Sequence, residues 1–199
     1  MLIRPADKSD VEDIARLALI AGEGIPAWFW KQSAGNGQTI EQVGAEKLHS
    51  EQDNFSYRNV QVAVIDNQIA GMMLAYRLPD ADDAEDLDEY PAFIRPMIEL
   101  EQCVPSSFYI NMLATFPDYR NMSIGTKLMN RVDRLAGDAG CTISSIAVFD
   151  QNEGALRLYR RLGYKIIENR PVVPHGSHPY DGNLLLLTRP VDFHKSENH

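Results

Sequence analysis

Apolar residues recur at two different spacings along the chain, and the spacing predicts which segments are helices and which are strands. Apolar side chains three or four positions apart, as at 11–18, are typical of a helix with one buried face. Runs rich in β-branched and aromatic residues, as at 60–65 and 69–76, are typical of strands, and the polar residues between these two runs predict a hairpin. The whole pattern predicts strands at 2–5, 60–65, 69–76, 107–116, 142–149, 164–173 and 184–188, and helices at 9–22, 39–50, 93–100, 123–139 and 152–162.

Polar caps and glycines mark the ends of the predicted helices. Ser9 and Glu12 have the spacing of a capping box, in which each side chain bonds a backbone N–H left unpaired at the helix start. Asn152 is suited to open its helix. Gly140 and Gly163 follow the last apolar positions of two helices, where glycine is the usual terminating residue.

The order of these elements predicts the fold class. A strand and helices come first, then a meander of strands, then strands alternating with helices. This mixed order favours an α+β fold with α/β-type layers, in which helices cover both faces of a mixed central sheet of about six to seven strands. We expect a single domain over 1–191 and a disordered tail over 192–199.

Composition and charge argue against several classes of protein, among them nucleic-acid-binding and membrane-spanning proteins. The 199 residues are 44% hydrophobic and 24% charged, as in ordinary soluble proteins. The net charge of −9 argues against a nucleic-acid partner. No apolar run reaches the length of a membrane span, and two distant cysteines predict neither a disulfide scaffold nor a metal site. We therefore expect a cytoplasmic protein without a metal or a membrane partner.

An acidic run at 79–90 contains seven carboxylates and no basic residue. Such a run is usually a solvated loop or surface helix, although it could also attract a cationic substrate. Its role stays open between these two interpretations.

The segment 109–128 carries the clearest chemical signal in the chain. It predicts a strand, a Pro turn and a loop that opens an amphipathic helix, with Arg120 before the loop and Gly125 within it. A loop at a helix start presents unpaired backbone N–H groups, and these suit phosphate oxygens. Gly125 would let the ligand approach the backbone closely.

Three segments resemble the GCN5-related N-acetyltransferase (GNAT) family, whose members use acetyl-coenzyme A. The segment 3–18, IRPADKSDVEDIARLA, is similar to the family's first strand and helix. The loop Arg120-Asn-Met-Ser-Ile-Gly125 is similar to the pattern Arg/Gln-x-x-Gly-x-Gly/Ala, except that Ser123 replaces the first glycine. The segment 152–164, NEGALRLYRRLGY, resembles Asn-x-x-Ala-x-x-Leu-Tyr-x-x-x-Gly-Phe/Tyr, and it is the most specific of the three.

The resemblance implies where acetyl-CoA would bind. The central strand would splay from the next parallel strand, and the pantetheine arm would contact the strand backbone. The loop would bind the pyrophosphate, and Ser123 would cost about 1 kcal/mol if its position required a positive φ. Alternatively, Ser123 would act as a helix N-cap. The implied coenzyme-binding residues are Met112, Leu113, Ala114, Arg120, Asn121, Met122, Ser123, Ile124, Gly125, Thr126 and Asn152.

The resemblance also implies a catalytic role for Tyr159. A departing thiolate must be protonated, and a phenol near the sulfur can act as the general acid. The alternative is an aromatic residue that only packs under the sheet. The sequence does not fix a general base, which could be water or one of four side chains: Glu23, Glu99, His175 and His178.

The resemblance further implies that the acceptor pocket is lined by the segment after the first helix, here the aromatic run 22–30, GEGIPAWFW. Glu23, Trp28 and Phe29 would suit an amine with an apolar or cationic body. The alternative is that the aromatic residues pack two helices into the core.

These observations favour an acetyl-CoA-dependent N-acetyltransferase that acts on a primary amine of a small molecule or peptide. The amine would attack directly in a ternary complex. A non-catalytic acyl-CoA-binding protein is one alternative. Another is an acyltransferase with a longer acyl donor, accommodated by Met72, Met73 and Met112. By analogy with the family, the protein could also form a homodimer.

Overall fold

The computed structural model describes residues 1–83, 86–176 and 179–193. Seven strands form a mixed sheet in the order β1-β2-β3-β4-β5-β7-β6, which confirms the predicted fold class. The strands are β1 (Leu2–Pro5), β2 (Val60–Ile65), β3 (Gln68–Arg77), β4 (Phe108–Thr115), β5 (Ile143–Phe149), β6 (Lys165–Pro171) and β7 (Asn183–Pro190). The α-helices are α1 (Val11–Ala21), α2 (Ile25–Ser33), α3 (Ile40–Leu48), α4 (Arg95–Gln102), α5 (Ile124–Met129), α6 (Val132–Asp138) and α7 (Glu153–Arg161).

The chain divides into two compact units, and strands β3 and β4 have residues in both. The first unit contains Met1–Ala75 and Met112–Met129. The second contains Tyr76–Asn111, Asn130–Gly176 and the chain from Tyr180 onward. The expectation of a single domain over 1–191 stays a prediction.

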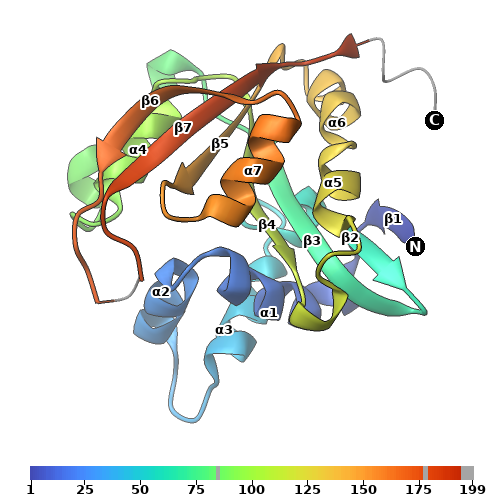
Figure 1. Ribbon diagram of the computed structural model, residues 1–199. Coiled ribbons are helices and arrows are strands. Elements are labelled where there is room, and N and C mark those ends of the chain that lie inside the picture. Colours follow the sequence, from blue (N-terminus) through green and yellow to red (C-terminus); the bar gives the residue numbers. More distant parts are fainter. Residues whose placement is uncertain (84–85, 177–178, 194–199) are drawn as a thin grey trace. The chain divides into compact units, whose positions relative to one another are not determined.

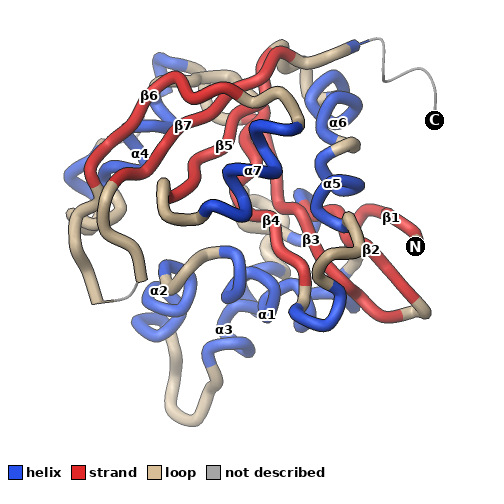
Figure 2. The backbone as a smooth tube through the Cα atoms, viewed as in Figure 1, coloured by secondary structure: helices blue, strands red, loops and turns tan. Residues whose placement is uncertain are grey.

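In the first unit, β1, β2 and β3 pair antiparallel, and α1, α2 and α3 pack on one another (Figure 2). The apolar stripe of α1 is buried, as its helical spacing predicts. Trp30 is buried between α2 and α3, where a Cβ on Gly44 would lie 2.4 Å from its ring. One of the three aromatic residues after α1 thus belongs to the core.

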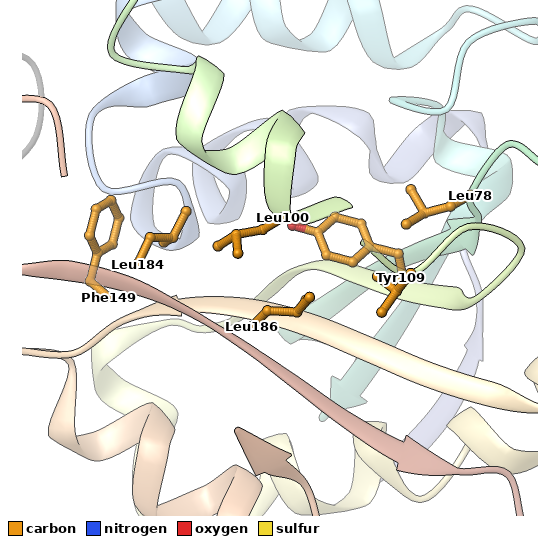
Figure 3. Packing of buried hydrophobic residues seen from close by; sticks show 7 residues of the cluster. Leu78, Leu100, Tyr109, Phe149, Leu184 and Leu186 are labelled. Atoms are coloured by element: carbon orange, nitrogen blue, oxygen red, sulfur yellow. The ribbon is translucent and has the colours of Figure 1, made fainter. Parts of the chain in front are cut away.

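In the second unit, β5 pairs parallel with β4 and antiparallel with β7, and β6 pairs antiparallel with β7. Helix α4 packs on β5, β6 and β7 (Figure 1). Tyr109 on β4 joins the apolar cluster under α4, and Figure 3 shows its hydroxyl directed toward the helix that carries Leu100. The other buried members of the cluster are Leu78, Val104, Phe149, Leu184 and Leu186.

Most predicted elements are present, but the start of the first helix differs. The capping box uses Asp7 and Asp10 around a 3-10 turn at Lys8–Asp10, and not Ser9 and Glu12. Asp7 accepts from the Ser9 backbone N–H at 2.8 Å, and Asp10 accepts from the Asp7 N–H at 2.8 Å. Arg4 explains this choice, because its Nη1 binds Asp10 Oδ2 at 2.6 Å and holds that side chain in place.

Two further differences concern helices: α2 forms where no helix was predicted, and one predicted helix is divided. The predicted helix at 123–139 is split into α5 and α6. The acidic run forms short 3-10 turns at Ala81–Asp83 and Leu87–Glu89, while Glu85 lies outside the described residues. In the predicted tail, the Asp192 N–H donates to Asp133 Oδ1 at 3.1 Å, and 194–199 lie outside the described residues.

Among the described residues, no helix combines the length and apolar character needed to cross a bilayer.

Candidate active site

The predicted phosphate loop of the first unit is anchored to strand β3 at its start and to helix α5 at its end. Before the loop, the Phe116 N–H donates to the Ala70 carbonyl at 2.9 Å, and the Tyr119 hydroxyl donates to Gln68 Oε1 at 2.8 Å. After the loop, the buried Ile124 begins α5, which packs on β2. The loop is therefore held between two anchored segments while its own residues 120–123 stay exposed.

Gly71 on β3 makes room for this arrangement, a role that the sequence does not reveal. A Cβ at Gly71 would lie 2.7 Å from the Ala114 carbonyl oxygen and 3.0 Å from Cγ2 of Ile124. Glycine therefore lets the end of β4 and the start of α5 approach β3 closely. Ala114 is a predicted coenzyme contact, so Gly71 packs directly against a residue of the predicted site.

The loop backbone has two residues in the left-handed region. Asn121 has φ of 63° and Ser123 has φ of 60°. Left-handed residues in a tight loop turn successive N–H groups toward one point, which forms a concave anion-binding nest. Phosphate binding by this loop stays a prediction.

Ser123 stands at the N-cap position of α5, and its carbonyl accepts from the Lys127 N–H at 3.0 Å. Its positive φ differs from the extended backbone of an ordinary N-cap. The position therefore carries the conformational cost that the sequence predicted for a non-glycine residue here, about 1 kcal/mol.

The remaining predicted coenzyme contacts of the first unit follow the loop and β4. Arg120 and Lys127 are exposed cations near the loop, while Met122 exposes 47% of its surface. Met112, Leu113, Gly125 and Thr126 are half-buried, and Ala114 is buried. Their contact with coenzyme A stays a prediction, as does the parting of β4 from β5.

In the second unit, Asn152 is the N-cap of α7, as predicted. Its Oδ1 accepts from the Ala155 N–H at 3.2 Å, and its own N–H donates to the Phe149 carbonyl at 3.0 Å. The preceding Asp150 is a supporting residue that the sequence analysis missed. Its Oδ2 accepts from the backbone and side-chain N–H groups of Asn183, at 3.0 and 3.1 Å. This pairing fixes the turn that presents Asn152.

Tyr159 is buried on α7, with 5% of its surface exposed. Its ring meets that of Tyr164 edge to face, with centroids 6.2 Å apart. Burial at this point is compatible with packing and with proton donation, so the catalytic role stays a prediction.

The predicted acceptor residues lie at the junction of α1 and α2. Glu23 has φ of 50°, and Gly24 follows with φ of 97°. Trp28 and Phe29 are edge to face with centroids 5.0 Å apart, and Phe29 exposes 36% of its surface. Unlike Trp30, Phe29 is therefore available at the surface of its unit, and a substrate role for these residues stays a prediction.

The four predicted candidates for the base have different surroundings. The Glu99 carboxylate binds Arg170 Nε at 2.8 Å, and the His175 ring stacks on Phe93 with centroids 3.9 Å apart. His178 lies outside the described residues, and Glu23 belongs to the first unit. A role for any of these groups as the base stays a prediction.

Two other expectations concern metals and acyl length. Within 1–83, 86–176 and 179–193, no group of three or more His, Cys, Asp or Glu side chains could hold a metal ion. Met72 and Met73 are fully buried in β3, where they form part of the core. They give no support to an enlarged acyl pocket.

Comparison with known proteins gives one family. The model of the acetyltransferase (GNAT) family matches residues 27–164. Thialysine N-epsilon-acetyltransferase of Bos taurus is 37% identical over 57 residues, which are 29% of this chain and 34% of the relative. The chain thus spans about a third of the length of this curated relative.

Solved structures share the fold over nearly the whole chain. A polyamine N-acetyltransferase of Drosophila melanogaster superposes with a TM-score of 0.66 and 18% identity, covering 95% of this chain and 99% of that one. A Salmonella typhimurium protein solved with its cofactor acetyl-CoA gives a TM-score of 0.58 at 17% identity, covering 96% and 94%. At these identities the likeness concerns the fold alone.

Proposed function

Since the chain belongs to the acetyltransferase (GNAT) family, we propose that it transfers an acetyl group from acetyl-CoA to a primary amine by direct attack in a ternary complex. The backbone of the loop 120–125 carries this proposal. Its left-handed Asn121 and Ser123 support the proposal, because left-handed residues in a tight loop can turn N–H groups toward a bound anion. Arg120 and Lys127 add positive charge in an otherwise acidic protein.

Acetyl-CoA would supply the activated acetyl thioester as a co-substrate. The chain's own residues would bind and orient it: the loop would hold the pyrophosphate, and backbone groups of Met112, Leu113 and Ala114 would hydrogen-bond the pantetheine arm. A backbone N–H there would also polarise the thioester carbonyl. Asn152 would contact the pantetheine region, and Tyr159 would protonate the departing sulfur.

The acceptor would be a small amine or a peptide amine. The Drosophila melanogaster neighbour is a polyamine N-acetyltransferase, and the bovine relative bears the name of an enzyme acting on thialysine. The net charge of −9 and the acidic run support a cationic acceptor. We further propose that Glu23, Trp28 and Phe29 contact it, and that the protein acts in the cytoplasm.

The test is a screen for acetyl-CoA-dependent thiol release with agmatine, spermidine, thialysine and short peptides. We expect turnover with at least one cationic amine. Coenzyme A binding without turnover across the panel would instead favour a non-catalytic acyl-CoA-binding protein. Gly125→Val should weaken acetyl-CoA binding by crowding the pyrophosphate, and binding at wild-type strength would place the coenzyme elsewhere.

A further inference from the structure

A carboxylate that the sequence analysis did not consider lies next to a buried tyrosine in the second unit. The side chain of Glu101, in the last turn of α4, is hydrogen-bonded to the side chain of Tyr109 on β4. Tyr109 exposes 2% of its surface, whereas Glu101 is half-buried. The pair therefore joins a buried phenol to a residue that is only partly buried.

Two more polar side chains lie beside Tyr109. The Tyr76 ring meets the Tyr109 ring edge to face, with centroids 6.0 Å apart. Asn111 follows Tyr109 by two positions on β4, so both side chains point to the same face of the sheet. Asn111 Nδ2 donates to the Tyr76 hydroxyl at 3.2 Å, and both residues are half-buried. Amide and hydroxyl groups thus lie next to the Glu101–Tyr109 pair.

This polar cluster is also close to the proposed general acid. Burial raises the pKa of Tyr109 well above its ordinary value of 10.0. Glu101, Tyr76 and Tyr159 each contribute electrostatically to the same rise. Asn111 also directly precedes Met112, the first proposed pantetheine contact on β4.

The geometry points to Glu101 as the general base that takes a proton from the acceptor amine, with Tyr109 as the residue that positions its carboxylate. This inference rests on the proposed function. It adds a residue outside the segments that carry the family resemblance, since Glu101 belongs to the helix inserted between β3 and β4.

The protons balance in this scheme. The acceptor ammonium gives one proton to Glu101, and the neutral nitrogen attacks the acetyl carbonyl carbon. An N–C bond forms, the C–S bond breaks, and Tyr159 protonates the sulfur. The amide nitrogen loses its extra proton to solvent, and Tyr159 and Glu101 return to their starting states by exchange with water. One proton is released for each amine acetylated.

Several other charged side chains around α4 form ion pairs with one another. Glu99 pairs with Arg170 on β6, Arg170 also lies 3.3 Å from Glu168, and β5 and β7 contribute apolar side chains to this face. At the start of α4, Arg95 binds Asp88 at 2.9 Å, and Cys103 Sγ lies 3.9 Å from Arg170 Nη2. Glu99 is therefore a matched control, two positions from Glu101 on the same helix.

The test compares Glu101→Gln, Glu99→Gln and the wild-type protein with the panel amine that the wild type acetylates fastest. At neutral pH only roughly one primary amine in a thousand is unprotonated. Without a general base, the enzyme can acetylate only the amine molecules that are already unprotonated in solution. We expect Glu101→Gln to lose about 100- to 10,000-fold in kcat/KM near pH 7 and to regain about tenfold for each pH unit upward.

The pH profile separates this role from a structural one. Glu99→Gln should keep the wild-type profile, and Tyr109→Phe should shift toward that of Glu101→Gln with a smaller loss. All variants should bind acetyl-CoA like the wild type. An active Glu101→Gln with a wild-type profile, or a loss equal at every pH, would overturn the inference and leave the proposed function intact. Absence of turnover in the wild type would overturn both. If Glu101→Gln does not fold, the pH profile of Tyr109→Phe tests the inference by itself, and a wild-type profile in that variant would overturn it.

Discussion

Gly71 and Ala114 lie so close that no side chain fits between them: a Cβ on Gly71 would stand 2.7 Å from the Ala114 carbonyl oxygen. The contact joins the middle of β3 to the end of β4, just before the loop that we propose binds the pyrophosphate. The absence of a side chain at Gly71 therefore allows β4 to enter the loop with its observed backbone path.

Gly71→Ala should destabilise the protein by about 1–3 kcal/mol, because overpacking forces the backbone to shift. It should also weaken acetyl-CoA binding. Urea unfolding and calorimetric titration measure the two effects. Gly137→Ala is the control: its Cβ would meet Phe193 at 3.7 Å, an ordinary contact, so helix propensity should make it neutral or slightly stabilising. Equal effects of the two substitutions would refute a special role for Gly71.

Ser123→Gly should stabilise the protein by about 0.5–1 kcal/mol, since glycine adopts φ of 60° without the steric cost that serine has. Asn121→Gly should gain less, because asparagine tolerates the left-handed region better. Thermal unfolding measures both. If Ser123→Gly lost stability or acetyl-CoA affinity, the serine hydroxyl would be making a contact that outweighs the strain.

Local features of the candidate site could be predicted from the sequence. The loop and the Asn152 cap could be found because each lies within one short segment whose spacing is diagnostic. The Glu101–Tyr109 pair could not, since its members sit on a helix and a strand that meet only in the folded unit. The Asp7 cap was missed for the same reason, because Arg4 on β1 selects Asp10 as its partner.

The ion pair between Asp133 and Arg189 should be important for stability. The two groups are 2.7 Å apart, with side chains 5% and 15% exposed, and Asp133 also accepts from the Asp192 N–H. Asp133→Asn should cost about 3–5 kcal/mol because it leaves a buried guanidinium without its counter-charge. Asp13→Asn, which breaks the exposed pair with Arg16, should cost less than about 1 kcal/mol in the same unfolding assay.

Tyr159→Phe should lower kcat by about 100-fold while leaving acetyl-CoA affinity nearly unchanged, because only the proton donor is removed. Steady-state kinetics and titration with acetyl-CoA measure the two quantities. Tyr164→Phe is the control, since it loses a hydroxyl bonded to Ser144 at 2.9 Å and should affect stability instead. Unchanged turnover in Tyr159→Phe would remove this residue from the mechanism.

Stability should fall in alkaline solution because of two buried phenols. Burial raises the pKa of Tyr109 well above 10.0, and burial also raises the pKa of Tyr164. The unfolded chain then ionises at lower pH than the folded protein, so this contribution to stability is intact below about pH 10 and is lost as the pH rises further. Urea unfolding measured upward from about pH 8 should therefore show a decline in wild-type stability that is smaller in Tyr109→Phe and smallest in the double variant with Tyr164→Phe. A decline of the same slope in all three proteins would mean that other groups cause it.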